Sequence, residues 1–477
     1  MATGIDISKQ IAILDEGTQI TPNVNKINFT GTGITATASG NDVTVNVVGA
    51  TGVWGIANTA GVYTFYSTLT LAMAAATSGQ TIEMFADVTE TGAVTITLKN
   101  GVTINGNSHT YTINNTTTHN FLIDNNVAIT FRINNLIVRK IGVQTVDTDN
   151  YLINQLNTNS NFDFSNSYFY STATVGRING RLTGGYYNGF GNTFIASCTL
   201  LNYGIISDIN VEIGNYTGDG STIYGFVNYG TLQNCNITTS NIQGLRNLGG
   251  SVAKNINVVS TNNVAFTAVY NDGELMNCTI NSVVSSLQNN SGHAYNCSAY
   301  SSSGIAISNG NYLYNSVGRS AASDGIRGTN STNKIVNCSG FSSALIGINT
   351  EGEAINSFGM STVNFGISSF LTGIFKECTS ISTAATAAAN GATWYNCTFQ
   401  STWNNAAGRA FDCQYGQCTL INSSFKVANT SANCIYNAAV KTIKYANNAF
   451  DGATTPVNAN ITQGVTNTHD NQGNILI

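Results

Sequence analysis

The chain repeats a short pattern of apolar and polar positions along most of its length. The pattern is an apolar residue, any residue, Asn and then a small residue, as in Leu275-Met276-Asn277-Cys278. After a first step of 42 residues, the steps between the Asn-like positions run from 19 to 26 residues. A period of about 20 residues predicts one coil of a parallel β-helix for each repeat. The Asn-like positions form a structural turn column: Asn166, Asp208, Asn234, Asn255, Asn277, Asn296, Asn315, Asn337, Asn356, Glu377, Asn396, Asn422 and Asn447.

The distribution of proline supports strands. The two prolines, Pro22 and Pro456, leave 433 residues between them without one. A central strand excludes proline because each of its residues must donate an N–H to a neighbouring strand. The stretch between the prolines is rich in Val, Ile, Thr, Tyr and Phe and is broken by Gly and Asn, a composition typical of strands joined by tight turns. We therefore expect an all-β fold.

The two repeated residue types have separate physical roles. Asn tolerates the left-handed backbone conformation that a sharp bend between strands requires. Its amide can also hydrogen-bond to the Asn of the next coil, about 4.8 Å away. The small residue that follows is most often Cys, and we expect it to point into the narrow coil interior, where Cys acts as a small hydrophobe.

The ten cysteines follow the coil period rather than the spacing of a disulfide framework. We expect most of them to be free, buried thiols, with a few bridges as the alternative. Cys413, Cys418 and Cys434 lie off the turn column. Of these, Cys413 and Cys418 are the pair that we expect to form a disulfide, because both fall in one enlarged turn.

The sequence predicts four segments. Residues 1–50 form an N-terminal β module, with strands at 25–30, 33–38 and 42–47, whose small core suggests that it oligomerises or docks onto another protein. Residues 51–80 hold a linker and one helix from Ser67, its expected N-cap, to Gly79. This helix would cover the open end of the first coil. Residues 81–450 form the β-helix, and 451–477 are a tail with strand character at its tip.

Charge and hydropathy exclude several classes of partner. Net charge is −5 with 18 Lys and Arg, which leaves little basic surface for nucleic acid. No run approaches 18 consecutive apolar residues, so we expect no membrane-spanning helix. The start of the chain, from Met1 to Gln10, lacks the basic and apolar regions of a secretory signal.

Acidic residues are sparse, and the catalytic residues, if there are any, remain unknown from the sequence. Glycan hydrolysis commonly uses two carboxylates, about 5–5.5 Å apart for retention and 6.5–9.5 Å for inversion. For each candidate we favour a structural or solvated role over a catalytic one. We expect Asp208 to be a turn residue and Glu377 to be exposed. The candidates are Asp147 with Asp149, Asp208 with Glu212, Asp272 with Glu274, Glu351 with Glu353, and Glu377.

No metal site or cofactor is expected. No cluster of three acids suits calcium, and no pair of histidines has the spacing of zinc ligands. We interpret the four histidines as surface or turn residues: His109, His119, His293 and His469.

Aromatic side chains are the candidates for binding a glycan without cleaving it. Most aromatics are expected to fill the coil interior, including those of the stretch from Tyr168 to Tyr170. Tyr186, Tyr187 and Trp403 are the three that we interpret as glycan contacts.

Two resemblances follow from these patterns. The stretch 67–113 and the Asn-Cys turns resemble the right-handed parallel β-helix of the pectate-lyase-like superfamily, over roughly 380 residues. The segment from Ile13-Leu14-Asp15-Glu16-Gly17 to Val48 is similar to the N-terminal module of bacteriophage tail fibres and spikes. The first resemblance implies a right-handed parallel β-helix, and with the coils of 19–26 residues found above, 15 or so coils would give a rod of roughly 70 Å.

The second resemblance implies a structural protein of the virion, assembled in the host cytoplasm, exposed on the particle and often trimeric. Its partners would be other virion proteins, through residues 1–50, and a host-surface polysaccharide or receptor. The alternative on the same fold is a tailspike that depolymerises glycans as a hydrolase or lyase. A bacterial surface adhesin is disfavoured because the secretory signal is missing.

Overall fold

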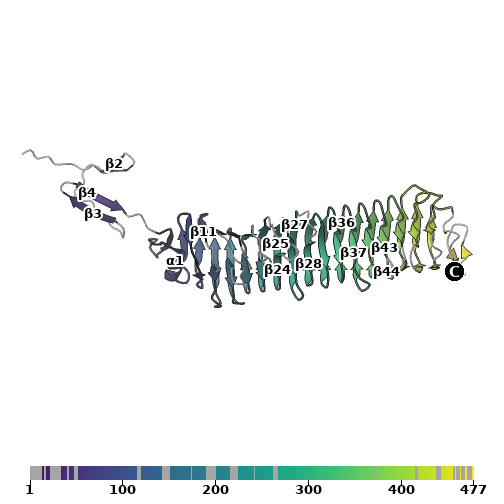
Figure 1. Cartoon of the computed structure of the whole chain (residues 1–477), viewed down its shortest axis with the longest axis horizontal. Helices are drawn as coiled ribbons and strands as arrows, with labels where there is room; N and C mark the ends of the chain where they lie inside the picture. Colours follow the sequence, from purple (N-terminus) through teal and green to yellow (C-terminus); the bar gives the residue numbers. More distant parts are fainter. Residues whose placement is uncertain are drawn as a thin grey trace, which may run out of the picture.

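The chain folds as an all-β protein, 54% strand and 2% helix, with a parallel β-solenoid of about 14 turns. The computed structural model describes residues 52–114, 120–141, 151–172, 175–189, 200–214, 224–240, 242–261, 267–369, 372–389, 391–413, 417–436, 442–454 and 457, and the backbone of short strands near both termini. Figure 1 shows the strands stacked side by side along one long axis. The predicted parallel β-helix is therefore confirmed.

Each coil contributes one strand to each of three faces, which we call faces 1, 2 and 3. In chain order a coil passes through face 3, face 1 and face 2, as in β28 (Thr267–Asn271), β29 (Glu274–Met276) and β30 (Thr279–Ser282). Each strand pairs in parallel with its equivalents in the neighbouring coils, so that equivalent residues lie directly over one another. This register creates columns of stacked side chains along the axis.

The three faces are built from equivalent strands. β25 (Thr231–Thr239) and β27 (Val252–Ser260) run unbroken from face 1 to face 2. The other strands of face 1 are β7 (Thr81–Met84), β10 (Thr103–Asn105), β13 (Thr130–Asn134), β16 (Asn161–Ser165), β19 (Arg181–Thr183), β22 (Ile205–Ser207), β29, β32 (His293–Tyr295), β35 (Tyr312–Tyr314), β38 (Lys334–Val336), β41 (Glu353–Ile355), β44 (Gly373–Lys376), β47 (Ala392–Tyr395), β50 (Cys418–Ile421), β53 (Thr442–Ala446) and β55 (Thr462–Gln463). Those of face 2 are β8 (Val88–Thr91), β11 (Thr110–Asn114), β14 (Ile137–Ile141), β17 (Tyr168–Ser171), β20 (Tyr186–Gly189), β23 (Asn210–Ile213), β30, β33 (Ser298–Ser301), β36 (Val317–Ser320), β39 (Ser339–Ser342), β42 (Phe358–Ser361), β45 (Thr379–Ser382), β48 (Thr398–Ser401), β51 (Ser424–Val427) and β54 (Ala449–Asp451). Those of face 3 are β9 (Ile96–Thr97), β12 (Leu122–Ile123), β15 (Ile153–Gln155), β18 (Gly176–Ile178), β21 (Leu200–Asn202), β24 (Tyr224–Asn228), β26 (Gln243–Asn247), β28, β31 (Ser285–Asn289), β34 (Ile307–Asn309), β37 (Ile326–Gly328), β40 (Ile348–Asn349), β43 (Ile367–Ser368), β46 (Ala388–Ala389), β49 (Phe411–Asp412) and β52 (Ile435–Tyr436).

Corner 1, between faces 1 and 2, is the predicted turn column. All thirteen of its predicted residues have φ between 46° and 59°, the left-handed region that Asn tolerates. Their side chains form a ladder: the Nδ2 of Asn296 donates to Asn277, and that of Asn277 donates to Asn255. Gly184, with φ 75°, holds the equivalent place in the coil between Asn166 and Asp208, which explains the first step of 42 residues.

The residue after corner 1 points inward, as predicted. Cys278 and Cys297 are 2% exposed, and Ser316 holds the same place in the next coil without exposure. Among the described residues, seven cysteines are buried, free thiols, Cys434 among them. Cys413 and Cys418 form a disulfide, which confirms the predicted pair.

Corner 2, between faces 2 and 3, carries a column of serines. Each hydroxyl donates to a backbone carbonyl of the preceding coil, as Ser320 does to Gly304 at 2.7 Å. All of them except Ser401 also accept the N–H of the third residue after them, as Ser320 does from Ser323 at 2.8 Å. The serines therefore fix the bend in the way that a helix N-cap fixes the first turn. The column contains Ser301, Ser320, Ser342, Ser361, Ser382 and Ser401.

Corner 3, between faces 3 and 1, holds a buried row of asparagines. From Asn202 to Asn289, each Nδ2 donates to the Oδ1 of the Asn in the next coil at 2.7 Å. Each Nδ2 of the row, including that of Asn309 at its end, also donates to a backbone carbonyl on face 1. The buried amides are therefore paired rather than left unsatisfied. The row consists of Asn202, Asn228, Asn247, Asn271, Asn289 and Asn309, none of which is exposed.

Three successive coils repeat the sequence Gly-x-Ser-x4-Gly-Ile. The first glycine occupies an inward position of a face 2 strand, and the second lies opposite it, directly before the face 3 strand. A Cβ on Gly318, Gly340 or Gly359 would run into the carbonyl oxygen of Gly325, Gly347 or Gly366, respectively. Only glycine allows the two backbones to approach so closely, so the solenoid is narrow in these three coils.

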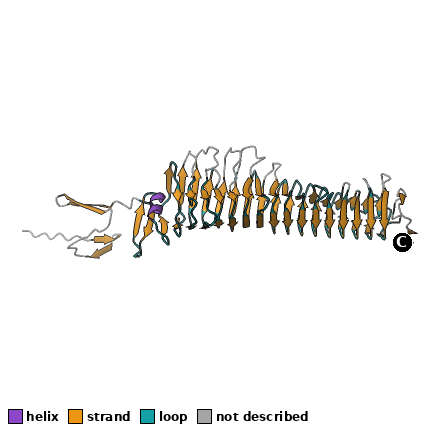
Figure 2. Ribbon diagram, turned by 90° about the horizontal axis from the view of Figure 1, so that it is seen from below, coloured by secondary structure: helices purple, strands orange, loops and turns teal. Residues whose placement is uncertain are grey.

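The helix α1 (Leu69–Ala75) covers the first coil with the buried side chains of Leu69, Ala72 and Met73. In Figure 2 it lies at one end of the strand stack. The expected boundaries need correction. The N-cap is Thr68, whose hydroxyl accepts the N–H of Leu71 at 3.2 Å, not Ser67. The helix ends well before Gly79, and the Nζ of Lys99 satisfies carbonyls of its last turn. β5 (Trp54–Ala57) pairs antiparallel with β6 (Tyr63–Tyr66) and β7.

The strands outside the solenoid are short and antiparallel. β3 (Ile34–Ser39) pairs with β4 (Asp42–Val47), close to two of the three predicted strands, and β1 (Ile13–Asp15) pairs with β2 (Thr18–Thr21). The predicted strand at 25–30 lies outside the described residues. In the tail, β57 (Ile475–Leu476) falls at the predicted tip and pairs with β56 (Thr468–His469). β56 and β55 lie upstream, where no strand was expected.

Candidate functional site

Four aromatic rings gather on face 1 near the middle of the solenoid. They belong to β32 and β35, whose first and third residues face outward while Ala294 and Leu313 are buried. The parallel register puts His293 over Tyr312 and Tyr295 over Tyr314. We call this surface, His293, Tyr295, Tyr312 and Tyr314, the aromatic platform.

The rings of the platform contact one another. The centroids of Tyr295 and Tyr314 are 5.3 Å apart with nearly parallel planes, and the ring of His293 meets Tyr312 edge-on at 4.9 Å. His293 is exposed and the three tyrosines are half-buried. Rings held by neighbours on a paired strand lose little freedom when a ligand binds, so the platform is preorganised.

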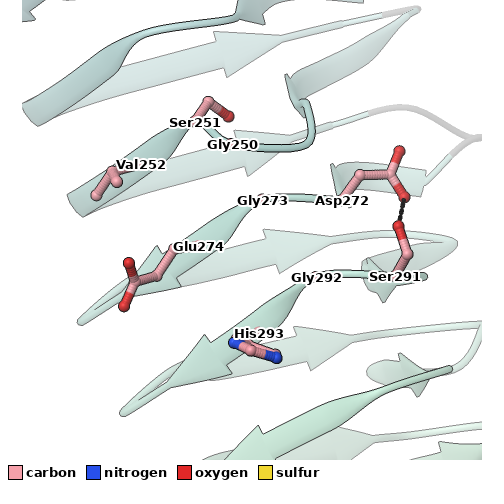
Figure 3. A pocket seen from close by; sticks show the side chains of 9 residues that line it. All are labelled: Gly250, Ser251, Val252, Asp272, Gly273, Glu274, Ser291, Gly292 and His293. Carbon is pink, nitrogen blue, oxygen red and sulfur yellow. Dashed lines mark hydrogen bonds between the residues drawn. The ribbon is translucent and has the colours of Figure 1, made fainter.

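A groove of about 250 Å³ adjoins the platform at corner 3. Figure 3 shows its lining, with Glu274 and His293 on one side and Asp272 on the other. The Oδ1 of Asp272 accepts a hydrogen bond from the hydroxyl of Ser291 at 2.7 Å. Partial burial, with the charge of Glu274 next in importance, raises the pKa of Tyr295. The groove therefore offers carboxylate acceptors beside aromatic surface.

The carboxylates of Asp272 and Glu274 do not face each other. In Figure 3 they project to opposite sides of Gly273, Asp272 toward Ser291 and Glu274 toward the outer surface of face 1. A catalytic dyad requires two carboxyl groups directed at one bond. This predicted pair is brought into one groove, but as two separate hydrogen-bond acceptors.

An ion-pair cluster borders the platform on the side away from the groove. Glu353 bonds to the Nζ of Lys376 at 2.8 Å and lies 3.7 Å from that of Lys334. The hydrogen bond from Lys376 holds the pKa of Glu353 below its ordinary value. Lys334 in turn lies 5.9 Å from the ring centroid of Tyr312. Glu353 is thus a paired carboxylate in strand β41, and the expectation that it lies in a solvated turn is wrong.

The other acidic candidates are dispersed. Asp208 has φ 59° and accepts a hydrogen bond from Asn234 at 3.0 Å, so it is a turn residue as predicted. Glu212 and Glu377 are exposed, as expected for Glu377. The pair Asp147 and Asp149 lies outside the described residues.

Sequence reasoning missed three buried aspartates. The carboxylate of Asp324 bonds to Arg327 at 2.7 Å, and that of Asp412 bonds to Arg409 at 2.8 Å. Asp124 accepts backbone N–H groups of Leu156 and Asn157. In each case the burial of charge is offset by a charge-assisted hydrogen bond, so these residues hold turns together.

The three predicted glycan contacts, Tyr186, Tyr187 and Trp403, do not lie together on one surface. Tyr187 as a glycan contact is wrong: its side chain is buried, stacks on Phe169 at 5.3 Å and donates its hydroxyl to Gly184. Tyr186 is half-buried on the outside, 5.5 Å from Tyr168. Neighbouring residues of a strand point to opposite faces, so only one of the two could be exposed. Trp403 is half-buried after β48, many coils from Tyr186.

The histidines differ in their surroundings. His109 contacts Asp87 at 3.1 Å, and His293 is exposed in the platform, in agreement with a surface position. His119 and the side chain of His469 lie outside the described residues. Within the described part of the chain, no group of three or more His, Cys, Asp or Glu is arranged to hold a metal ion.

The platform could have been found by aligning the coils. In His293-Ala294-Tyr295-Asn296 and Tyr312-Leu313-Tyr314-Asn315 the aromatics occupy the first and third places before the turn column. Both places must face outward if the second faces inward. Superposing the repeats therefore brings these four aromatics together on one surface.

After comparison with known proteins, the chain can be described only by its architecture. No helix among the described residues has the length and apolar character to cross a membrane. No protein-family model matches the sequence, and no curated protein matches it either. The chain is therefore characterised by its fold, a parallel β-solenoid of about 14 turns with one short helix over its first coil.

Proposed function

We propose that the protein is a rod-shaped structural component of a phage particle that recognises a glycan on the host surface. The observation that carries the proposal is the aromatic platform, four outward rings on two adjacent coils next to a groove with carboxylates. About 14 turns of about 4.8 Å each give a rod of about 67 Å, long enough to project a lateral binding surface from a particle.

A glycan fits the chemistry of the platform. The C–H face of a sugar ring is apolar and carries partial positive charge, and it stacks on the electron-rich face of an aromatic ring. Sugar hydroxyls need acceptors, which Asp272 and Glu274 supply at the edge of the platform. Binding sites of this kind combine aromatic lining with a few placed polar groups.

The N-terminal strands are the proposed attachment module. In β3 and β4 the register pairs Ile34 with Val47 and Ala36 with Val45. A two-stranded hairpin cannot bury such residues alone, so a contact with another chain, in a homotrimer or with a further virion protein, would stabilise it. Deleting residues 1–50 should leave a soluble rod that no longer joins particles, and normal occupancy of the truncated chain would disprove this role.

Binding to an array of neutral oligosaccharides tests the proposed recognition. Tyr312→Ala should weaken the affinity for any bound glycan at least ten-fold. The matched control is Tyr395→Ala, because Tyr395 is an outward tyrosine on the same face several coils away, with Lys376 and Ile421 rather than aromatic rings in register beside it. Equal affinities of Tyr312→Ala and wild type, with unchanged thermal unfolding, would rule out the platform as the binding surface.

A further inference from the structure

A second groove, of about 330 Å³, lies on face 2. It runs along the axis over four coils, from β33 through β36 and β39 to β42 and the start of corner 2. The side chains that define it are Tyr300, Arg319, Phe341, Ser343, Met360 and Thr362. It is separated from the aromatic platform by corner 1 and uses none of the platform residues.

The position of this groove follows from the Gly-x-Ser-x4-Gly-Ile coils. The variable residue x is Arg319, Phe341 and Met360 in the three copies, stacked in register on the outside of face 2. The inward glycines before them bring faces 2 and 3 together. The groove therefore lies over the narrow part of the solenoid, with one outward side chain from each narrow coil.

Arg319 is the charged group of the groove and has no acidic partner. Its side chain is exposed, and its guanidinium lies 4.3 Å from the ring centroid of Phe341. Within the described residues it makes no hydrogen bond or ion pair. Asp324, five residues away, is already bonded to Arg327. On the outside of face 2, the residues in register with Arg319 in the two neighbouring coils, Tyr300 and Phe341, are uncharged.

We propose that this groove binds a carboxylate-bearing sugar unit, such as a uronic or sialic acid, of a host glycan. The inference rests on the proposed recognition of glycans and adds the chemical class of a second site. Arginine presents a planar fork that matches a carboxylate with two parallel hydrogen bonds. The guanidinium packs on the ring of Phe341 and lines the groove.

The rest of the groove suits a sugar ring. Tyr300, 45% exposed, offers an aromatic surface one coil from Arg319. Met360 adds a flexible apolar contact on the other side. Thr362 donates its hydroxyl to the Ser343 carbonyl at 2.8 Å, so its oxygen can still accept from a sugar hydroxyl. A sugar that lacked the carboxylate would leave Arg319 unpaired.

The test compares acidic oligosaccharides with their methyl esters. A panel of uronic-acid and sialic-acid oligomers, each also with its carboxyl groups methylated, is titrated against the full-length chain. Wild type should bind at least one acidic oligomer, and its methyl ester should bind at least ten-fold more weakly. Arg319→Gln should bind the acidic oligomer at least ten-fold more weakly than wild type does, whereas Arg319→Lys should retain part of the affinity.

The matched control is Arg139→Gln. Arg139 is also an exposed arginine on face 2 above an aromatic ring, that of Tyr170 at 5.7 Å, but it is remote from the groove. Its variant should bind as wild type does. No binding of any acidic oligomer, or equal binding of the esters or of Arg319→Gln, would overturn the inference. If neutral glycans still bound to wild type and lost affinity in Tyr312→Ala, the proposed function would nevertheless stand.

Discussion

The side-chain amide of Asn271 donates a hydrogen bond to the Oδ1 of Asn289 at 2.7 Å, and neither residue is exposed to solvent. The same Nδ2 group also bonds to the carbonyl oxygens of Gly273 and His293. One amide thus joins face 3 to face 1 and one coil to the next. A buried polar row of this kind stabilises the fold only while every member is paired.

Replacing Asn271 with Ala should therefore destabilise the solenoid strongly. The change removes one hydrogen bond from each of two buried partners, the Nδ2 of Asn247 and the Oδ1 of Asn289, at a cost of about 1–3 kcal/mol for each group. Urea unfolding followed by circular dichroism measures the loss. Asn281→Ala is the control, since Asn281 is exposed on β30, and it should be nearly neutral. Equal unfolding midpoints would mean that the row does not hold the corner.

Glu377→Asn should stabilise the protein. Glu377 has φ 56° in corner 1, where thirteen other described coils carry Asn or Asp, Asn135 among them. A left-handed conformation costs most residues about 1–2 kcal/mol, and Asn less. The exposed Glu212→Asn, at a strand position with ordinary φ, is the control and should give no gain. A lower thermal midpoint for Glu377→Asn would contradict this explanation of the turn column.

The sequence alone predicted the features that repeat with a clear physical cause. Asn at the bend and a small residue after it recur because every coil needs a left-handed turn and a narrow interior. From Cys278 and Cys297 one could infer both the period and the inward direction. The disulfide of Cys413 with Cys418 followed because both lie off that column in one enlarged turn.

Substitutions at Cys297 test the inward column. Cys297→Ser should be mild, because Ser316 and Ser357 occupy the equivalent place in other coils. Cys297→Asp should cost several kcal/mol, since it buries an unpaired charge, on the order of the penalty for breaking a buried ion pair. Ser303→Asp, on the exposed corner 2, should change the thermal midpoint little. Similar midpoints for the two Asp variants would refute the inward direction.

Alkaline pH should weaken the fold through the buried thiols. Burial raises the pKa of Cys338 to about 12, against about 8.5 in an unfolded chain. Above pH 8.5 the unfolded chain loses this proton while the folded chain keeps it. The stabilising contribution is therefore complete below pH 8.5 and is lost as the pH rises toward 12. At pH 10 the loss is about 2 kcal/mol.

Cys338→Ser isolates this contribution. Urea unfolding at pH 7, 8.5 and 10 under reducing conditions should show a steeper fall in the free energy of unfolding for wild type than for the variant. Other titrating groups are common to both proteins and cancel in the difference. Parallel pH profiles would show that Cys338 ionises equally in the folded and unfolded chains.

The buried asparagine row and the platform escaped prediction for a common reason. In Val269-Tyr270-Asn271-Asp272-Gly273 the Asn before Asp-Gly is typical of an exposed turn, because the pairing that allows its burial lies in other coils. Likewise the pairing of His293 with Tyr312 depends on register. Neither the burial of Asn271 nor the pairing of His293 with Tyr312 can be inferred from the residues next to them in the sequence. The choice between Tyr186 and Tyr187 was open to sequence reasoning, since alternation excludes both being outward.

The glycine-rich coils divide each repeat into a part that cannot vary and a part that can. Gly340 and Gly347 admit no other residue because their backbones nearly touch, and Ser342 fastens the bend by a hydrogen bond to the preceding coil. The side chain of Phe341, between them, lies half-buried on the outside of face 2 and contacts other outward side chains, Phe358 and Arg319, rather than the interior. Exchanging the outward residues of three such coils would yield rods with one backbone and different surface chemistry. Adaptation to a new ligand could therefore proceed by single substitutions without loss of foldability.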